Sequence, residues 1–443
     1  MKKNFALTLL LSSFAVNWCA ASEATNVVVI SPEYLSALAA EMRTNLPSLQ
    51  AADARADAAK ENVRTISTWE DPTARIGFMG AREEMRADEG DVIYGVEEKL
   101  PLFGKPESAR RVAQAELAME NANTDYQFQV SRADLAKLLF AAALANQNVV
   151  IAEQDLGWLD LAVQTADAKY RAGQATLVEL LLLKNERAKR TTELETDREE
   201  LMHRHVALNR ILNRSPHSPW PDLELPPLAG PVSFSSRLVE LAFNHEPKLR
   251  VLERQTRRAE AALDATRRER FPDVNVGLEA RNFSGDGSVR QGMLVLSMNL
   301  PWANREKYRG AIQRDQANLK AAELDAVDYQ ASLRETIHEL TLKIDAARRN
   351  ALLYRDEILP RSQSALESSR AGWEASQSPF RDMLDARRML LDARLSYARA
   401  ISEQYQLLSE LALRCGLENF SGLERMEQEI GEAIRSKSDL SGK

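Results

Sequence analysis

Two aspartates in the last quarter of the chain, Asp382 and Asp385, have the clearest arrangement for guiding a charged species. Their i, i+3 spacing puts both carboxylates on one face of a helix. If several copies of the chain surround one axis, the pair forms two stacked carboxylate rings, which favour cations and can act as a gate. Arg381, Arg387 and Arg388 lie close by and could pair with them instead, so a solvated helix face is the alternative.

A histidine pair is the second candidate for chemistry. His203 and His205 follow two glutamates, but residues two apart on a helix point about 200° away from each other. Two helix histidines that share one metal ion need i, i+4 spacing. Cys415 is the only cysteine expected in the mature chain, which excludes an intrachain disulfide and disfavours a cysteine metal cage. With no catalytic triad or phosphate loop in the sequence, we predict no enzyme activity, no metal site and no cofactor.

The composition limits the classes of partner. The 443 residues contain 58 Lys and Arg against 65 Asp and Glu, a net charge of −7, and no basic block that would bind nucleic acid. Glycine (18), proline (16) and aromatic residues (6%) are scarce, which is typical of long helices. The mean hydropathy is −0.38, and we find no apolar run of about 18 residues after the leader, so we expect no transmembrane helix. A transmembrane β-barrel stays possible because its strands alternate.

Residues 1–21 have the character of a bacterial export signal. A lysine pair precedes the apolar stretch 5–16, and small residues follow it, so we expect cleavage near Ala21. A lipoprotein signal would instead make Cys19 the acylated first residue. The bulky Trp18 directly before it disfavours that alternative.

In the rest of the chain, short sequence motifs recur at an offset of about 200 residues. Several short matches recur in the same order, which predicts an internal repeat. They include Pro47-Ser48-Leu49 with Pro247-Lys248-Leu249, Leu100-Pro101 with Leu300-Pro301, and Arg171-Ala172-Gly173 with Arg370-Ala371-Gly372. We expect a first repeat at 22–214, an ordered linker at 215–232, a second repeat at 233–416 and a frayed polar tail at 417–443.

Each repeat is expected to contain a short helix, two strands, a long helix, a sharp turn and a second helix. The scarcity of glycine and proline predicts helices at 107–172 and 174–214, and at 311–371 and 380–415. The first of these would be about 100 Å long. Pro360 should bend the third. Apolar stripes of this length need neighbouring helices, which a coiled coil would also supply.

Four segments alternate with a period of two, and their apolar residues fall mainly at even positions. They lie near 72–82, 92–102, 272–282 and 290–301. Each has about the 9–11 residues that a tilted strand needs to cross a bilayer, although a half-buried soluble sheet alternates in the same way. Four strands cannot close a membrane barrel, and lipid does not tolerate unpaired edges. We therefore expect the chain to contribute strands to an oligomeric barrel.

Together these features resemble the TolC-type outer-membrane efflux channels, from about Asn45 to Gly416. The resemblance rests on the duplicated Pro-x-Leu helix starts, the strand pairs that end in Leu-Pro, the turn at 169–173 and the Asp-x-x-Asp-Ala sequence at 382–386. It implies a mostly α fold with a small β part. In it, a homotrimer forms an outer-membrane β-barrel, with four strands per chain, that continues as an α-helical periplasmic tunnel. The segment 100–105 is similar to the heavy-metal, cobalt–zinc–cadmium branch.

The resemblance also implies partners and site residues. The partners are outer-membrane lipid, a periplasmic adaptor protein and an inner-membrane efflux pump of the RND type. Asp382 and Asp385 would form the pore gate, with Glu179 opposite Asp382 in the first repeat. Gly173 and Gly372 would end helices at positive φ, at tips that contact the adaptor.

The expected function is therefore a passive export duct for substrates of the pump, with heavy-metal cations as candidates. Two alternatives remain: a periplasmic coiled-coil adaptor, and a structural protein of an envelope export complex. An adaptor would need glycine-rich domains dense in strands, which this sequence does not suggest. A structural coiled coil would leave the alternating strand pairs unexplained.

Overall fold

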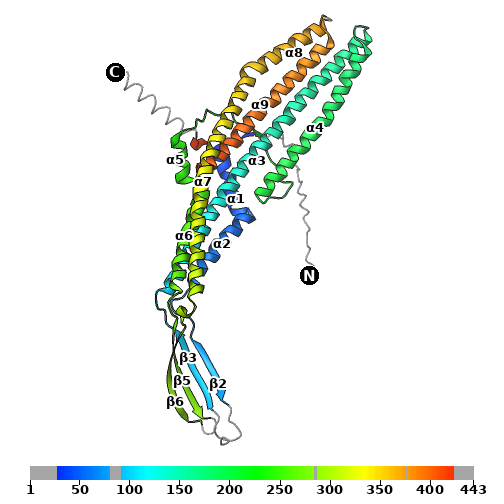
Figure 1. Cartoon of the computed structure of the whole chain (residues 1–443). Coiled ribbons are helices and arrows are strands. Elements are labelled where there is room, and N and C mark those ends of the chain that lie inside the picture. The colour runs from blue at the N-terminus through cyan, green and yellow to red at the C-terminus, as the bar shows by residue number, and fades with distance from the viewer. Residues whose placement is uncertain (1–26, 80–90, 284–286, 376, 424–443) are drawn as a thin grey trace, which may run out of the picture.

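The structure is a computed structural model that describes residues 27–79, 91–283, 287–375 and 377–423. The predicted export signal and residues 424–443 of the tail lie outside the described residues. The described chain is elongated, with a β-sheet at one end and two helical hairpins at the other (Figure 1). Shorter helices pack against the long ones near the middle (Figure 1).

The described part of the first half contains one long helical hairpin, two shorter helices and three strands. In chain order its elements are β1 (Val27–Val29), α1 (Pro32–Asn45), α2 (Pro47–Thr65), β2 (Thr73–Met79), β3 (Asp91–Lys99), α3 (Lys105–Arg171) and α4 (Leu177–Ile211). The predicted short helix corresponds to α2, whereas helix α1 was not predicted. Helix α4 begins three residues later than expected because the Thr176 hydroxyl caps it, accepting a hydrogen bond from the Glu179 amide (3.3 Å).

The second half repeats this order with a divided long helix. Its elements are β4 (Asp222–Glu224), α5 (Ser236–His245), α6 (Pro247–Arg268), β5 (Val274–Phe283), β6 (Val289–Met298), the 3₁₀ turn η1 (Pro301–Asn304), α7 (Arg305–Leu353), the π-helical turn η2 (Tyr354–Ile358), α8 (Leu359–Glu374) and α9 (Phe380–Arg414). The sequence predicted one helix over 311–371. Because Pro360 lacks an amide hydrogen and its ring crowds the preceding turn, the ladder widens into η2 just before it.

The sheet at one end joins the two repeats. Its strand order is β2-β3-β5-β6, with all neighbours antiparallel. The central pair, β3 with β5, comes from different repeats and places Tyr94 opposite Ala280. Strands β2 and β6 lie at the two edges, and each has one edge without a partner in the part of the chain that the structure describes.

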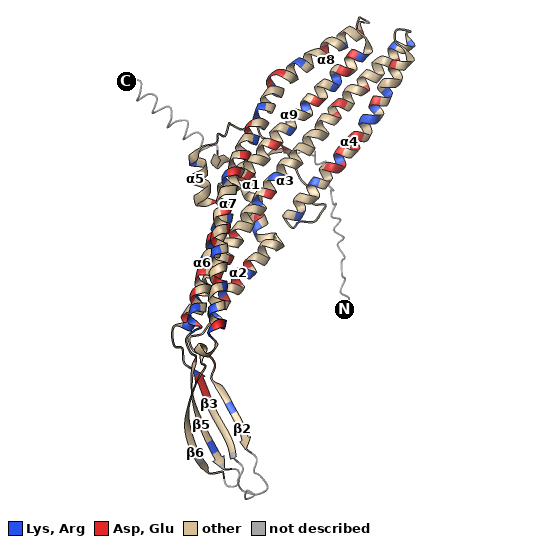
Figure 2. Ribbon diagram, in the orientation of Figure 1, with Lys and Arg blue, Asp and Glu red and all other residues tan. Residues whose placement is uncertain are grey.

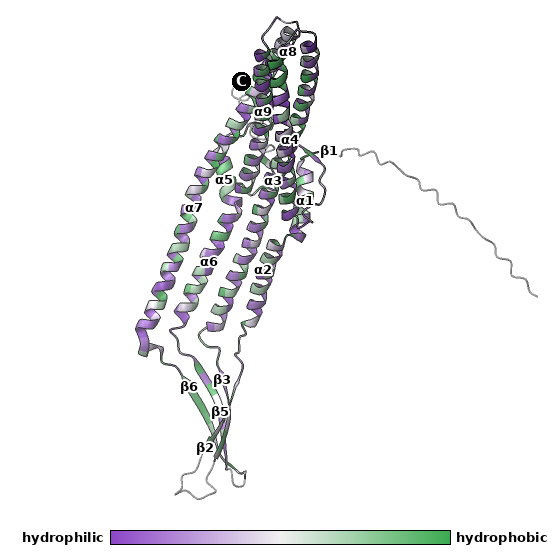
Figure 3. Cartoon of the chain, turned by 90° about the vertical axis from the view of Figure 1, so that its right-hand side faces the viewer, coloured by the Kyte–Doolittle hydropathy of each residue, from purple (hydrophilic) through white to green (hydrophobic). Residues whose placement is uncertain are grey.

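The predicted alternation along the strands is confirmed. Even positions are apolar and exposed, as at Phe78 (81% exposed), Leu278 (69%) and Leu294 (71%). The odd face is mainly polar, although Met293 (43% exposed) also lies on it: the Glu97 carboxylate accepts hydrogen bonds from Arg75 (2.8 Å) and from the Ser297 hydroxyl (2.9 Å). In Figure 3 the strands are largely coloured as hydrophobic, whereas the helices beside them mix both colours. The sheet therefore has one apolar face and one polar face.

The predicted linker is ordered, and the start of the predicted tail is part of the fold. The linker 215–232 contains β4, which pairs in parallel with β1. The first residues of the predicted tail are packed and not frayed, because the side chains of Phe420 (5% exposed) and Leu423 (0%) are part of the core. Phe420 lies against the rings of Phe140 (6.0 Å between centroids) and Tyr405 (5.1 Å).

The largest core lies at mid-height, where α1, α3, α5, α7 and α9 contribute buried side chains. Helix α3 is the one described helix with an 18-residue window apolar enough, by length and composition, to cross a membrane. The search for an uninterrupted apolar run missed this window. The protein buries 56% of it, which shows that the apolar residues of α3 mainly serve helix packing.

Candidate functional site

The two helical tips that carry the predicted site residues lie together, at the end of the molecule opposite the sheet (Figure 1). One tip joins α3 to α4 and the other joins α8 to α9. Gly173 has a φ of +70°. Its amide donates to the carbonyl of Tyr170 (3.0 Å), and the Gln174 amide donates to Lys169 (2.8 Å), which closes the end of α3. Gly173 is therefore the helix-ending glycine that the sequence predicted.

Gly372 has a different role from the predicted one. It lies inside α8, and the positive-φ residues in the described part of the chain do not include it. Its carbonyl accepts the amides of Gln377 (2.7 Å) and Ser378 (3.1 Å), so the following turn folds back on it. A Cβ added at Gly372 would lie 2.9 Å from the Cβ of Ser378. Glycine is needed there for close approach and not for its backbone conformation.

The predicted gate residues Asp382 and Asp385 are both exposed on the first turns of α9. Asp385 lies between two arginines, 3.7 Å from Arg381 and 3.8 Å from Arg388. These exposed pairs are long and contribute little to stability. Among the described residues, Asp382 has no ion pair, and its place in the first turn is favoured by the helix dipole. The carboxylates are thus accessible to ions from solvent.

Glu179 lies in the first turn of α4 and is partly exposed. Its amide is held by the Thr176 cap, so its position is set by the start of the helix. The structure thus places Glu179 at the start of α4 and the two aspartates at the start of α9, next to the two tips.

One lysine fastens the two tips to each other. The Lys169 ammonium on α3 donates to the carbonyls of Trp373 (2.6 Å) and Glu374 (2.9 Å) at the end of α8. It also lies 4.6 Å from the centre of the Trp373 ring. A cation beside the last carbonyls of a helix interacts favourably with its dipole, so this contact holds the second tip against the first.

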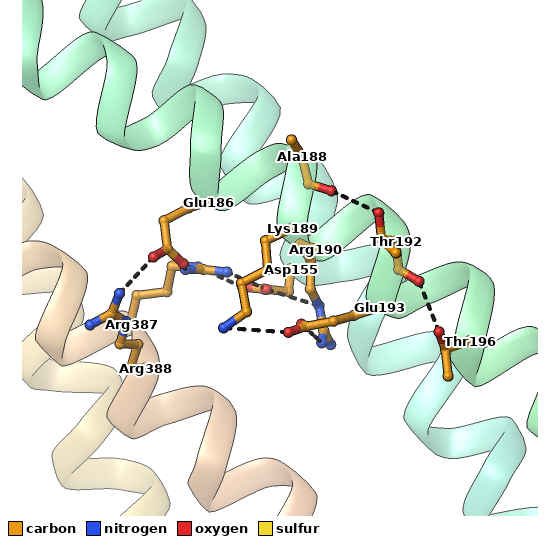
Figure 4. A network of polar contacts seen from close by, with 10 residues as sticks. All are labelled: Asp155, Glu186, Ala188, Lys189, Arg190, Thr192, Glu193, Thr196, Arg387 and Arg388. Atoms are coloured by element: carbon orange, nitrogen blue, oxygen red, sulfur yellow. Dashed lines mark hydrogen bonds and ion pairs between the residues drawn. The ribbon is translucent and has the colours of Figure 1, made fainter.

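A buried ionic cluster lies further along the same hairpins and joins α3, α4 and α9 (Figure 4). Arg387 makes a two-pronged contact with Asp155 through Nε (2.9 Å) and Nη2 (2.6 Å). The Nε atom of Arg190 lies 3.2 Å from the same carboxylate. These three side chains are 5–9% exposed. Water screens them little, so the cluster fixes how α9 packs on the first hairpin.

Glu186 extends this cluster towards the surface. It accepts a hydrogen bond from Arg388 (2.6 Å) and lies 3.5 Å from Arg387. Burial raises the pKa of the Glu186 carboxyl, but the Arg388 hydrogen bond and the charges of both arginines outweigh burial, so the pKa lies below its ordinary value. The sequence suggested that Arg387 could neutralise the gate aspartates; in the structure it instead pairs with Asp155 and Glu186.

The two histidines considered as metal ligands have different surroundings. His203 is exposed, whereas His205 stacks on Trp220 with 6.3 Å between ring centroids. In the described residues, no group of three or more His, Cys, Asp or Glu side chains is placed to hold a metal ion.

Comparison with known proteins gives one match to a family and several to solved structures. The outer membrane efflux protein family matches residues 38–214 and 238–416. The cobalt-zinc-cadmium resistance protein CzcC of Cupriavidus metallidurans is 23% identical over 301 residues, which are 68% of this chain and 69% of CzcC.

The structural neighbours share the fold. The outer-membrane channel OprN has a TM-score of 0.76 at 16% identity, covering 86% of this chain and 89% of OprN. The CmeC outer membrane channel of Campylobacter jejuni has a TM-score of 0.73 at 12% identity, covering 96% of this chain and 97% of CmeC. The family matches cover both halves of the chain, so this protein belongs to the outer membrane efflux protein family and is an efflux channel of the bacterial outer membrane with a helical periplasmic part.

Proposed function

We propose that the chain acts as a homotrimer, in which three sheets close one barrel and three sets of helices form one tunnel. The observation that carries this proposal is the four-stranded sheet, whose strands β2 and β6 each have one edge without a partner among the described residues and which has an exposed apolar face. Lipid does not tolerate open edges, and a barrel removes them. Pairing of β6 with β2 of the next copy would satisfy both edges at once.

In this trimer the tips form the periplasmic entrance, and Asp382 and Asp385 are its gate. Three copies place up to six exposed carboxylates around one axis, where they attract cations. Glu179 would contribute from the first repeat, because it starts α4 at the equivalent tip. Gly173 and Gly372 shape the tips, which we propose as the contact surface for a periplasmic adaptor.

The proposed partners are an adaptor and an inner-membrane pump of the RND type, which would deliver substrate to the tunnel. Heavy-metal cations are the proposed cargo, because a relative is named as a cobalt-zinc-cadmium resistance protein. The chain would supply a passive duct, and its acidic entrance suits positively charged cargo.

Cross-linking of the full-length protein purified in detergent tests the assembly. We expect cross-linked species to stop at three subunits. A monomeric or dimeric native mass, or recovery from the soluble periplasmic fraction, would contradict the proposal and favour an adaptor or a structural coiled-coil protein.

Growth tests examine the cargo separately. Deletion of the gene should lower tolerance to cobalt, zinc and cadmium, and the wild-type gene should restore it. Unchanged tolerance to all three metals in the deletion strain, with a trimeric channel, would remove the metal assignment and leave the duct intact.

A further inference from the structure

A basic cavity lies where the helices meet the strands. Its volume is about 460 Å³, and it is formed by the residues after α6, the turn η1 and the first turns of α7. Its lining includes Arg270, Trp302, Arg305, Tyr308 and Arg309, and no acidic residue among the described ones. Lysines and arginines gather at these helix ends, next to the strands (Figure 2).

The three arginines of this cavity have no ion pair within the part of the chain that the structure describes. Arg270 lies over the Phe271 ring (5.2 Å). Arg305 and Arg309 are exposed and share one side of α7 at i, i+4, where like charges repel. Positive charges near a helix N-terminus also oppose the helix dipole. These charges do not stabilise the helix, so their arrangement suits an external anion.

In the proposed trimer, the cavity opens on the outer side of the helical layer. Asp315 marks the side of α7 that faces α6, since it accepts a hydrogen bond from Thr266 (2.6 Å). Gln316, which lines the cavity, is turned about 100° away from it. About five turns further on, the same side of α7 carries Arg334, which lies 5.6 Å from the Phe243 ring of α5. A helix on the luminal side would obstruct the tunnel, so the side that carries α5 faces outward.

The cavity also lies at the edge of the apolar surface. Along β6 the exposed apolar residues end at Met298 (48% exposed) and Leu300 (53%), and Trp302 (52%) follows in the cavity wall. Tryptophan and basic residues are typical of the membrane interface. Arg309 lies about 6 Å along the helix from Arg305, and the headgroup layer of one leaflet is about 5–8 Å thick. Both guanidinium groups therefore fit the level of the periplasmic headgroups.

The first repeat supplies an internal comparison. A cavity of about 280 Å³ occupies the equivalent place and is lined by Glu70, Leu102, Lys105 and Ala109, which correspond to Arg270, Trp302, Arg305 and Arg309. Its lysines are neutralised, because Lys105 donates to Asp273 (2.9 Å) and Lys99 donates to Glu70 (2.7 Å). The basic side chains at this junction are thus paired with carboxylates in the first repeat, whereas those of the second-repeat cavity keep their positive charge unpaired among the described residues.

From this geometry we infer that the second-repeat cavity binds the headgroup of an anionic glycerophospholipid, such as phosphatidylglycerol, in the periplasmic leaflet of the outer membrane. Arg305 and Arg309 bind the phosphate through their guanidinium groups, and Arg270 supplies a third positive charge. Trp302 lies at the boundary with the acyl chains. The site takes no part in gating or export, so it can fail while the channel function holds.

Quenching of tryptophan fluorescence by brominated lipids tests the site in the full-length trimer. A Trp69→Phe background removes the exposed tryptophan that precedes β2 in the first repeat (52% exposed). We expect brominated phosphatidylglycerol in phosphatidylcholine vesicles to quench Trp302 more than brominated phosphatidylcholine does. One basic residue near an anionic surface contributes about fivefold in affinity, so Arg305→Gln with Arg309→Gln should reduce the preference by about 25-fold.

Matched variants separate a site from general surface charge. Lys320→Gln with Lys343→Gln removes the same charge from exposed positions higher on α7 and should keep the preference. Arg270→Glu, which copies the first repeat, should reduce it. Equal quenching by the two lipids in the wild type, or an equal loss in the Lys320 and Lys343 control, would overturn the inference. Loss of the preference on addition of inorganic phosphate would show a free-anion site and overturn the lipid assignment.

Discussion

Arg387 on α9 and Asp155 on α3 form a two-pronged ion pair, with contacts of 2.9 and 2.6 Å and less than a tenth of either side chain exposed. Arg387→Met leaves the buried Asp155 with Arg190 (3.2 Å) as its remaining partner. A fully unpaired buried charge costs about 3–5 kcal/mol, so we expect Arg387→Met to lower the free energy of unfolding by less than that amount. Arg388→Met, whose contact with Glu186 is partly exposed, should cost about 1 kcal/mol or less.

A double substitution separates the charge effect from packing. Asp155→Leu with Arg387→Met removes both charges and leaves Arg190 paired with Glu193 (3.0 Å), so it should recover part of the stability lost in Arg387→Met. Thermal or denaturant unfolding of the purified protein measures all variants. Stability of the double variant no better than that of Arg387→Met would show that this pair is not the source of the loss.

Neutralising the proposed gate aspartates should alter ion selectivity. Asp382→Asn with Asp385→Asn keeps size and removes up to six charges from the proposed trimer entrance, so cation selectivity should fall and block by polyvalent cations from the periplasmic side should be lost. Planar-bilayer recordings measure both properties. Asp325→Asn with Asp328→Asn is the control, because this exposed pair has the same spacing on α7. Wild-type selectivity in the gate variant would identify the aspartates as a solvated helix face.

Substitutions of the two tip glycines should destabilise the protein for different reasons. Gly372→Ala brings a Cβ against Ser378, so Ser378→Gly should restore its stability. Gly173 has open space around it but a φ of +70°, so Gly173→Val should be the worst tolerated and Gly173→Asn milder. Unfolding temperature and export by the variants measure the outcome. Rescue of Gly173→Val by Ser378→Gly would contradict this assignment.

Glu246 should make stability depend on pH. It is 0% exposed, accepts a hydrogen bond from Tyr329 (2.6 Å) and lies 3.7 Å from Arg414. Burial raises its pKa above 4.5, although the hydrogen bonds from Tyr329 and the Leu249 amide and the Arg414 charge oppose this. The folded state then holds the proton more tightly than the unfolded state.

The direction of the pH effect follows from this difference. When the pH is above the pKa that Glu246 has in the folded state, its buried charge lowers the free energy of unfolding. This loss of stability disappears as the pH falls towards 4.5. Glu246→Gln should remove that dependence, so the wild type should gain stability relative to the variant as the pH falls through this window. Denaturant unfolding across the pH range measures the difference; parallel curves for the two proteins would rule out titration of Glu246.

Local rules in the sequence account for the strands and long helices. Alternation placed Phe78 and Leu278 on the exposed face correctly, because strand side chains have a period of two. The lack of proline in 107–172 predicted α3 to within two residues at its start, since little else interrupts a helix.

Tertiary contacts could not be predicted in the same way. Asp155 and Arg387 are 232 residues apart, and nothing local marks either as buried. Gly372 occupies the repeat position that corresponds to Gly173. Helix α8 nevertheless continues past Gly372, because the turn at Ser378 folds back on α8. The basic cavity was missed for a similar reason: Arg270 and Arg305 come from opposite sides of a hairpin.

The pairing of β3 with β5 sets an order of events during secretion. The Tyr94 hydroxyl donates to Asn282 (3.0 Å), a contact that spans 188 residues. A chain that leaves the translocon N-terminus first therefore presents the hairpin of β2 and β3 long before its partner arrives, and an isolated hairpin is only marginally stable in water. The sheet cannot assemble until most of the chain has been exported, so the apolar strand face needs protection in the periplasm throughout that interval.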